Sequence, residues 1–298
     1  MSRPYPTPPD IRALLGEQFP QLALSEIVPV EEGGDHLTVE VDDLIFRFPR
    51  DTRTATKLER EIALLPMIRP GLPVPIPDPV YVGRPSRLYP YPFAGYPRLL
   101  GISGEVLHPP PERRPSLARQ CAGFLSSLHS FPTERAQQCG IEQEPLPDPA
   151  PLLDRVIRLV DPVRPRCVQL VPRTEPYLAP EIPLPPPSWL SPVVSHADLK
   201  GEHILLSPDA TAISGIIDWT DIALCDPVVD FTGLMIWLGE PFVRQVLAHY
   251  TPPTNGAFLD RVLFYARCFA IEQLGLRLTG QSDAPLPLLL TQLHWAFT

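Results

Sequence analysis

The sequence SHADLKGEHILL spans residues 195–206, and GIIDW follows at residues 215–219. In both segments, charged residues and histidines lie between or directly after short apolar runs that favour β-strands. Loops between strands commonly carry functional side chains. The order of Asp198, His203 and Asp218 indicates a base followed by two oxygen or nitrogen ligands. Such a set could hold a hard cation such as Mg²⁺ against phosphate oxygens.

The residues N-terminal to this segment predict a small antiparallel sheet with one helix. Apolar and alternating runs predict the strands, and Leu58, Ile62 and Leu65 recur at helical spacing. A proline-rich connector is expected between the helix and the last two strands. The strands are expected at Ser25–Val30, Leu37–Val41, Leu44–Phe48, Val80–Val82 and Leu88–Tyr91, and the helix at Thr54–Ile68.

The rest of the chain is predicted to be mainly helical. Helical periodicity is seen over Ser116–Phe131, Pro151–Leu170 and 228–295, with breaks at 239–241 and 252–253. The proline-dense stretch 172–192 is expected to be an extended wrap or a loop. Short strands at Val193–Val194, Ile204–Leu206 and Ile213–Ile217 frame the charged segment. The fold class is therefore α+β with two lobes, divided into residues 1–101 and 102–298.

Composition excludes several classes of protein. The chain has 298 residues, of which 44% are hydrophobic, and a net charge of −9, which argues against a nucleic-acid binder. No apolar run is long enough for a membrane span, and the N-terminus has no secretory signal. Five scattered cysteines without a CxxC pair indicate free thiols, a cytoplasmic location and no zinc site. The 43 prolines argue against a long coiled coil.

The motifs around this segment resemble those of kinases. Residues 196–203 have the spacing of the eukaryotic-type kinase catalytic loop, H-x-D-L-K-x-x-N, with His203 replacing the final Asn. Asp218-Trp219 stands where kinases have D-F-G. The segment 226–230 is similar to the D-P-x-x-D run of the aminoglycoside phosphotransferase family.

The N-terminal segments resemble the same family, in the order of its motifs. They are similar to its nucleotide loop at 32–36, its third strand at 45–50, its ion-pair helix at 60–62 and the hinge of its 2″-hydroxyl branch at 93–101. The resemblance therefore covers about residues 25–235 and implies a kinase-like fold, with a small β lobe and a larger helical lobe.

The resemblance also implies roles for individual residues. Asp198 would deprotonate the acceptor hydroxyl, and Lys200 would contact the γ-phosphate. His203 and Asp218 would ligate Mg²⁺, and Arg47, held by Glu61, would contact the α- and β-phosphates. The residues expected to bind the rest of the ATP or GTP are Gly33, Gly34, Tyr96 at the gatekeeper position, and the backbone of Pro97 and Leu99. A bulky Tyr96 would favour GTP.

The implied enzyme is a nucleoside-triphosphate-dependent kinase of a small-molecule hydroxyl, with an aminoglycoside as the expected acceptor. The sequence leaves open whether it serves antibiotic resistance or a housekeeping reaction. Residues 102–298 carry a net charge of −7, against −2 for residues 1–101, which suits a cationic acceptor or simply solubility. Asp198, Asp221, Glu240 and Glu272 are the expected acceptor-binding residues. A monomer is expected, with no nucleic-acid or membrane partner.

The sequence is compatible with three alternatives. The same chemistry could serve a macrolide or another metabolite, which an apolar acceptor groove would support. A non-catalytic nucleotide-binding module is a second alternative, and a protein kinase a third, although no A-P-E segment follows Asp218. His196 is expected to be a buried, hydrogen-bonded residue, and Asp226 and Asp230 are expected to support the loop.

Overall fold

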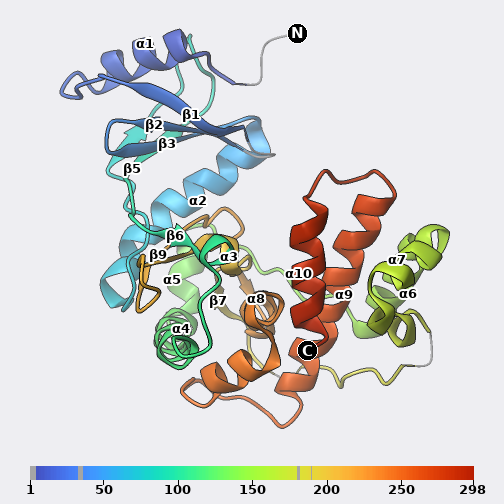
Figure 1. Cartoon of the computed structure of the whole chain (residues 1–298). Coiled ribbons are helices and arrows are strands. Elements are labelled where there is room, and N and C mark those ends of the chain that lie inside the picture. Colours follow the sequence, from blue (N-terminus) through green and yellow to red (C-terminus); the bar gives the residue numbers. More distant parts are fainter. Residues whose placement is uncertain (1–4, 33–35, 180–181, 189) are drawn as a thin grey trace.

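The computed structural model describes residues 5–32, 36–179, 182–188 and 190–298. A β-sheet with a helix on each side forms one lobe, and a larger, mainly helical lobe lies below it (Figure 1). This arrangement confirms the predicted fold class, a small antiparallel lobe joined to a mainly helical one.

The first lobe is built on a five-stranded antiparallel sheet with the order β1-β2-β3-β5-β4. Helix α1 lies on one face of this sheet and α2 on the other (Figure 1). The elements are β1 Ile27–Glu32, β2 His36–Val41, β3 Leu44–Pro49, β4 Tyr81–Gly83, β5 Phe93–Pro97, α1 Pro8–Gln18 and α2 Thr52–Ile68.

The side chains of β3 point alternately to the two faces of the sheet, so that core residues lie on one face and Arg47 lies on the other. Phe46 and Phe48 are fully buried in the core that the sheet shares with α1. Arg47, between them in the strand, projects from the opposite face, toward α2. The alternation predicted for this strand therefore places one cation on the face where the lobes meet.

Two differences from the prediction concern the first helix and the last strand of this lobe. Helix α1 was not predicted because its start, at Pro8 and Pro9, follows a proline-rich segment. These prolines occupy the first helical turn, where no amide donor is needed, and Thr7 and Asp10 form a capping box.

The second difference concerns the end of the first lobe. The strand predicted at Leu88–Tyr91 is wrong, and the strand is Phe93–Pro97 instead, within the segment expected to be the hinge. Gly95 lies against the Phe46 ring, where a side chain would overlap that ring. A glycine that reads as coil in the sequence is thus required by close packing in the sheet.

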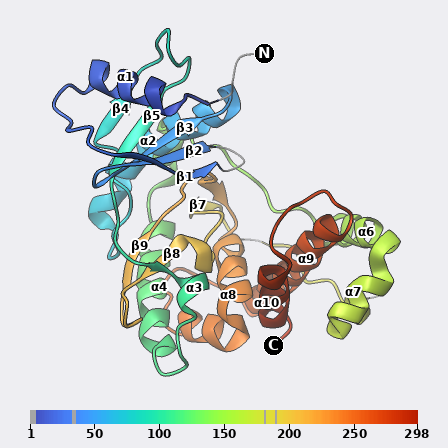
Figure 2. The ribbon, with the colours of Figure 1, turned by 45° about the horizontal axis from the view of Figure 1, so that its top comes forward.

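The second lobe packs around the kinked helix α8. The kink lies at Gly239, whose φ of 77° only glycine adopts without strain, and it matches the predicted break. Helices α6 and α7 lie beyond α9, on the side away from α8 (Figure 2). The helices are α3 Gly104–Leu107, α4 Arg114–His129, α5 Thr133–Gln138, α6 Pro149–Val160, α7 Arg164–Leu170, α8 Val228–Leu247, α9 Phe258–Leu278 and α10 Leu286–Ala296.

Two small sheets carry the segment that contains Asp198. One has the strand order β6-β8-β9 and the other pairs β10 with β7. The strand β10 was not predicted, and part of the proline-dense stretch forms a 3₁₀ helix over Pro172–Leu178. The bounds are β6 Ile102–Ser103, β7 Val193–Ser195, β8 Ile204–Leu206, β9 Ile213–Ile216 and β10 Ala223–Cys225. Within the described ranges, none of the helices has the length and apolarity needed to cross a membrane.

Candidate active site

The loop between β7 and β8 is anchored to the start of α8 by a fully buried carboxylate. Asp230 accepts the backbone N–H of His196 at 3.1 Å and that of Ala197 at 2.9 Å. Its oxygen Oδ2 also lies 2.9 Å from Nε2 of His129. Three donors on one buried carboxylate fix the loop backbone two residues before Asp198. The support expected from Asp230 is therefore present.

Asp226 has a different role from the one expected for it. Its Oδ1 accepts the backbone N–H of Val228, the first residue of α8, at 3.0 Å. Its Oδ2 pairs with the buried Arg261 of α9 at 2.7 Å. Asp226 thus joins α8 to α9 rather than supporting the loop directly.

His196 is a buried, neutral part of the loop. Its Nδ1 accepts the backbone N–H of Asp198 at 3.3 Å, so its Nε2 carries the proton and donates to the carbonyl of Ile217 at 3.0 Å. Burial lowers the pKa of His196, which keeps it uncharged. The ring therefore ties the Asp198 loop to the residue before Asp218.

Glycines let α8 and α3 approach this loop closely. A side chain on Gly233 of α8 would overlap the backbone carbonyl of Leu199. A side chain on Gly201 or Gly104 would overlap the ring of Trp237, whose Nε1 donates to the Gly104 carbonyl at 3.2 Å. The loop is therefore held by backbone packing as well as by hydrogen bonds.

Asp198 lies among other charged side chains at the tip of the loop between β7 and β8. Nζ of Lys200 is 3.3 Å from Oδ2 of Asp198 and 3.0 Å from Oε2 of Glu202. Burial raises the pKa of Asp198, with Lys200 and His203 opposing the shift. Burial alone would lower the pKa of Lys200, but the two carboxylates raise it, so the amine stays charged. A carboxylate with a raised pKa is a better proton acceptor near neutral pH.

His203 and Asp218 face each other across the loop. Nδ1 of His203 donates to the Asp198 carbonyl at 2.8 Å, so the lone pair is on Nε2. That nitrogen is 3.6 Å from Oδ2 of Asp218. Burial would raise the pKa of Asp218, but the charge of Arg47 lowers it well below its usual value, so the carboxylate is ionised.

These two donors fit a magnesium ion that is shared with a nucleotide. Mg²⁺ in such sites commonly takes one or two protein ligands, and phosphate oxygens and water complete its shell. The described residues contain no group of three or more His, Cys, Asp or Glu side chains that could hold a metal ion by themselves. A histidine ligand is unusual for Mg²⁺, but the fixed tautomer leaves Nε2 available.

Arg47 joins the two lobes beside this pair. One of its nitrogens is 3.1 Å from Oε2 of the buried Glu61 on α2, and the other is 2.9 Å from Oδ1 of Asp218. The hydroxyl of Tyr96 donates to the second oxygen of Glu61 at 2.7 Å. The structure thus brings Arg47, Glu61, Tyr96 and Asp218 into one network, and the pairing of Arg47 with Glu61 is as expected.

Two further residues of this network were given no role of their own in the sequence analysis, although His36 ends the segment 32–36 that resembles the nucleotide loop. Thr220 donates to Oδ1 of Asp218 at 2.9 Å and accepts from Arg47 at 2.5 Å. His36 lies with Nδ1 3.2 Å from the same guanidinium, and burial together with Arg47 lowers its pKa to about 3. Thr220 follows Asp218 by two residues, a spacing that could have marked it. His36 has no sequence signal beyond its place after the glycines.

The other residues expected to bind the nucleotide are Gly33, Gly34, Pro97 and Leu99. Gly33 and Gly34 lie outside the described residues. Pro97 ends β5, opposite Leu44 of β3. Leu99 follows in the connection between the lobes and packs against Gly215 of β9.

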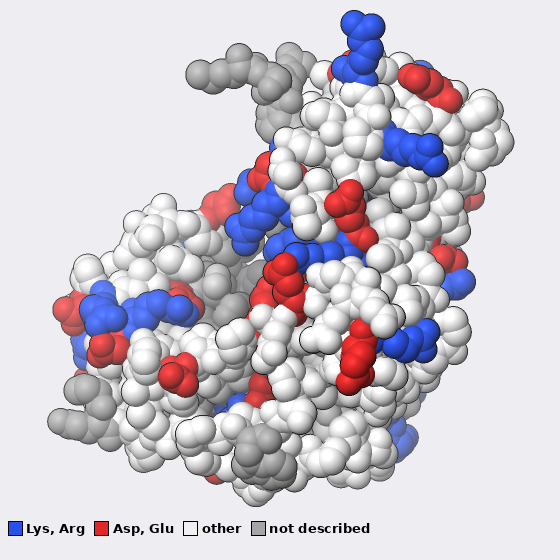
Figure 3. All heavy atoms as spheres, turned by 180° about the vertical axis from the view of Figure 1, so that it is seen from behind, with Lys and Arg blue, Asp and Glu red and all other residues white. Residues whose placement is uncertain are grey.

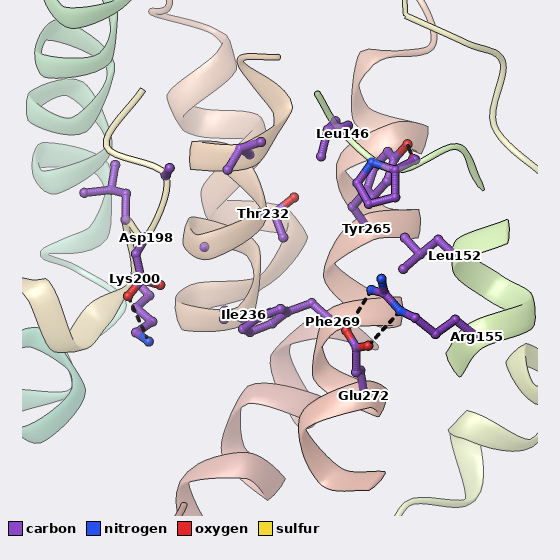
Figure 4. A pocket seen from close by; sticks show the side chains of 15 residues that line it. Leu146, Leu152, Arg155, Asp198, Lys200, Thr232, Ile236, Tyr265, Phe269 and Glu272 are labelled. Carbon is purple, nitrogen blue, oxygen red and sulfur yellow. Dashed lines mark hydrogen bonds and ion pairs between the residues drawn. The ribbon is translucent and has the colours of Figure 1, made fainter. Parts of the chain in front are cut away.

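A cavity of about 190 Å³ opens beside Asp198, between the loop and helices α6, α8 and α9 (Figure 4). Asp198 and Lys200 lie at one end, and Arg155 and Glu272 lie at the other. The walls between them are largely apolar. The lining residues are Leu146, Pro147, Leu152, Arg155, Ala197, Asp198, Leu199, Lys200, Val229, Thr232, Gly233, Ile236, Tyr265, Phe269 and Glu272.

Two of the acidic residues expected to bind the acceptor, Asp221 and Glu240, lie outside the lining of this cavity. Asp221 pairs with Lys57 of α2 at 2.5 Å, and Glu240 pairs with Arg244 on its own helix at 2.6 Å. Neither residue is among those described as lining the cavity, whereas Asp198 and Glu272 are. Side chains of both charges border the hollow between the lobes (Figure 3). The cavity itself is lined by two acidic and two basic side chains, so the acidic surface expected from the net charge is not concentrated there.

Comparison with known proteins agrees with this arrangement. Residues 26–260 match the model of the phosphotransferase enzyme family, APH. Viomycin phosphotransferase from Streptomyces vinaceus is 30% identical over 86 residues, which are 28% of this chain and 30% of that protein. The chain's match thus spans less than a third of that curated relative.

Solved structures match over almost the whole chain. A GDP and kanamycin complex of APH(2″)-IIIa is 27% identical with a TM-score of 0.69, and covers 96% of both chains. The GDP complex of wild-type aminoglycoside 2′-phosphotransferase-IIIa is 26% identical with a TM-score of 0.73, over 96% of this chain and 97% of that one. Macrolide 2′-phosphotransferase type I, at 22% identity and a TM-score of 0.62, shares the fold over 96% of both chains. The family match covers most of the chain and the predicted resemblance is confirmed, so this protein belongs to the phosphotransferase enzyme family.

Proposed function

We propose that this protein transfers the γ-phosphoryl group of a nucleoside triphosphate to a hydroxyl of a small molecule, with an aminoglycoside as the first acceptor class. The observation that carries the proposal is the position of Asp198. Its carboxylate lies at one end of the cavity and 3.4 Å from His203, which in turn faces Asp218. A hydroxyl in the cavity and a phosphate near His203 would therefore meet at Asp198.

The nucleotide would bind between the lobes, with residues 1–101 supplying most of its contacts. Arg47 is held by Glu61 and is directed toward Asp218, so it is positioned to bind phosphate oxygens. Magnesium held by His203 and Asp218 would neutralise phosphate charge. Gly33, Gly34, Tyr96 and the backbone of Pro97 and Leu99 would bind the rest of the nucleotide. Related structures contain GDP, which supports testing GTP alongside ATP.

Residues 102–298 would bind the acceptor and perform the transfer. Asp198 would accept the hydroxyl proton, helped by the burial that raises its pKa. Lys200, which stays charged beside Asp198 and Glu202, would stabilise the transferred phosphoryl group. Transfer of a phosphoryl group depends chiefly on positioning and charge neutralisation, and these residues supply both.

A macrolide or another weakly charged metabolite is the second acceptor candidate. The cavity walls between its charged ends are formed largely by aliphatic and aromatic side chains, among them Leu152, Ile236 and Phe269. This is the apolar groove that the alternative requires. A non-catalytic module is disfavoured because Asp198, His203, Asp218 and Arg47 all converge.

The proposal also includes a cytoplasmic monomer. The five cysteines are free, as in proteins of a reducing compartment. Size-exclusion chromatography with light scattering would measure the oligomeric state directly.

A steady-state assay tests the reaction. The purified protein, Mg²⁺ and ATP or GTP are combined with kanamycin, viomycin, a macrolide and simple amino alcohols, and nucleotide consumption and phosphorylated product are measured. Acceptor-dependent consumption with a phosphorylated product is expected. Tight nucleotide binding without turnover on any acceptor would contradict the proposal and favour the non-catalytic module. A strong preference for ATP would contradict the GTP expectation from Tyr96.

Replacing Arg47 with lysine is expected to raise the KM for the nucleotide about tenfold. A lysine has a single ammonium nitrogen, whereas the guanidinium uses one nitrogen for Glu61 and the other for Asp218 and Thr220. Nucleotide titrations at saturating acceptor measure the effect, with the exposed Arg158→Lys as control. An unchanged KM would show that Arg47 does not bind the nucleotide.

A further inference from the structure

We infer that Arg155 is a specificity-determining residue of the acceptor cavity, where it neutralises Glu272 and so disfavours polycationic acceptors. The inference rests on the proposed function, because it assigns the cavity beside Asp198 to the acceptor. It differs from the sequence expectation, in which Glu272 binds an ammonium group of the acceptor.

The two side chains form a bidentate ion pair between α6 and α9. Nε of Arg155 is 3.0 Å from Oε1 of Glu272, and its second guanidinium nitrogen is 3.3 Å from Oε2 (Figure 4). Parallel contacts of this kind occupy both carboxylate oxygens with defined geometry. The negative charge of Glu272, whose side chain is 20% exposed, is therefore already neutralised by Arg155.

The position of α6 that makes this pair possible is fixed by packing. Gly275 of α9 lies against Leu159 and Val160 of α6, so closely that a side chain there would press on Val160. Arg155 is about one turn from these residues on the same helix. The close approach of the helices thus holds the guanidinium over Glu272.

The charges of the cavity cancel as a result. Its charged lining residues are Asp198 with Lys200 at one end and Glu272 with Arg155 at the other. Apolar side chains, with Ile236 and Phe269 among them, lie between these pairs. A molecule with several ammonium groups would lose hydration here without gaining a free carboxylate. An aminoglycoside that binds here would therefore meet no free carboxylate at this end of the cavity, and an acceptor with an apolar face and few cationic groups would bind more tightly.

Calorimetric binding to the full-length protein, with a non-hydrolysable nucleotide and Mg²⁺ present, tests the inference. The probes are kanamycin, a polycation, and erythromycin, a macrolide with a single amine. Arg155→Ala is expected to tighten kanamycin binding about fivefold, which is the upper range for a partly exposed ion pair. Erythromycin binding should change less than twofold. The double variant Arg155→Ala/Glu272→Gln should lose the gain, because no carboxylate remains to be freed.

The matched control is Arg158→Ala, on the same helix, whose exposed side chain pairs with Asp154 away from the cavity. It should bind both probes as the wild type does. The inference would be overturned by an unchanged or weaker kanamycin affinity in Arg155→Ala, or by a gain in affinity that persists in the double variant. It would also be overturned if neither probe bound any variant. If the expected binding shift occurs while no probe is phosphorylated, the inference holds and the proposed reaction fails.

Discussion

Replacement of Asp198 by alanine is expected to lower kcat for phosphoryl transfer by about 10²- to 10⁴-fold, the usual contribution of a positioned general base. The carboxylate lies between the cavity and His203, and no other described carboxylate joins the cavity lining at this end. Nucleotide affinity should change little, since Arg47 and Asp218 remain paired. Single-turnover kinetics with a saturating acceptor separate the chemical step from binding.

The loop should keep its shape in this variant. Lys200 still has Glu202 at 3.0 Å, and Asp230 still holds the backbone of His196 and Ala197. Asp283→Ala, which removes an exposed carboxylate, is the control and should leave kcat unchanged. A kcat for Asp198→Ala within a few-fold of the wild type would exclude Asp198 as the base.

Replacement of Asp230 by alanine is expected to lower the free energy of unfolding by about 3–5 kcal/mol, as for other broken buried charged interactions. The carboxylate is fully buried and accepts from two backbone amides and His129. Its removal would leave these groups without an acceptor in a dry interior. Urea denaturation followed by circular dichroism measures the change.

Activity should fall together with stability in this variant, because the loop that carries Asp198 loses its anchor. Asp230→Asn keeps one oxygen acceptor and should recover part of the stability. Asp154→Ala, which removes an exposed i,i+4 pair, is the control and should cost well under 1 kcal/mol. A loss below about 1 kcal/mol for Asp230→Ala would show that other contacts hold the loop.

Local sequence patterns predicted much of the fold and the centre of the site. The strands around Arg47 follow from alternation, and the helix that carries Glu61 follows from its 3.6-residue period. Asp198 and His203 are five residues apart, and the hydrogen bond from the His203 ring to the Asp198 carbonyl is a contact within that short segment. Such features depend on neighbours in the chain, so the sequence displays them directly.

The predictions failed for two secondary-structure elements whose formation depends on residues distant in the sequence. Gly95 reads as a hinge glycine, but it belongs to a strand because the Phe46 ring of β3 occupies the space beside it. The first helix was missed because its prolines read as coil, whereas the aromatic core under the sheet gives its Ile11, Leu14 and Leu15 a surface to cover.

Motifs and periodicity in the sequence were enough to identify the family, the two-lobe class and the residues around which the candidate chemistry is built. The charge balance of the cavity beside Asp198 depends instead on tertiary contacts. Glu272 lies 117 residues from Arg155, and Asp221 lies 164 residues from Lys57. Whether a carboxylate is free or neutralised depends on which cation the packing of helices brings within about 4 Å, and the net charge of a segment carries no such information.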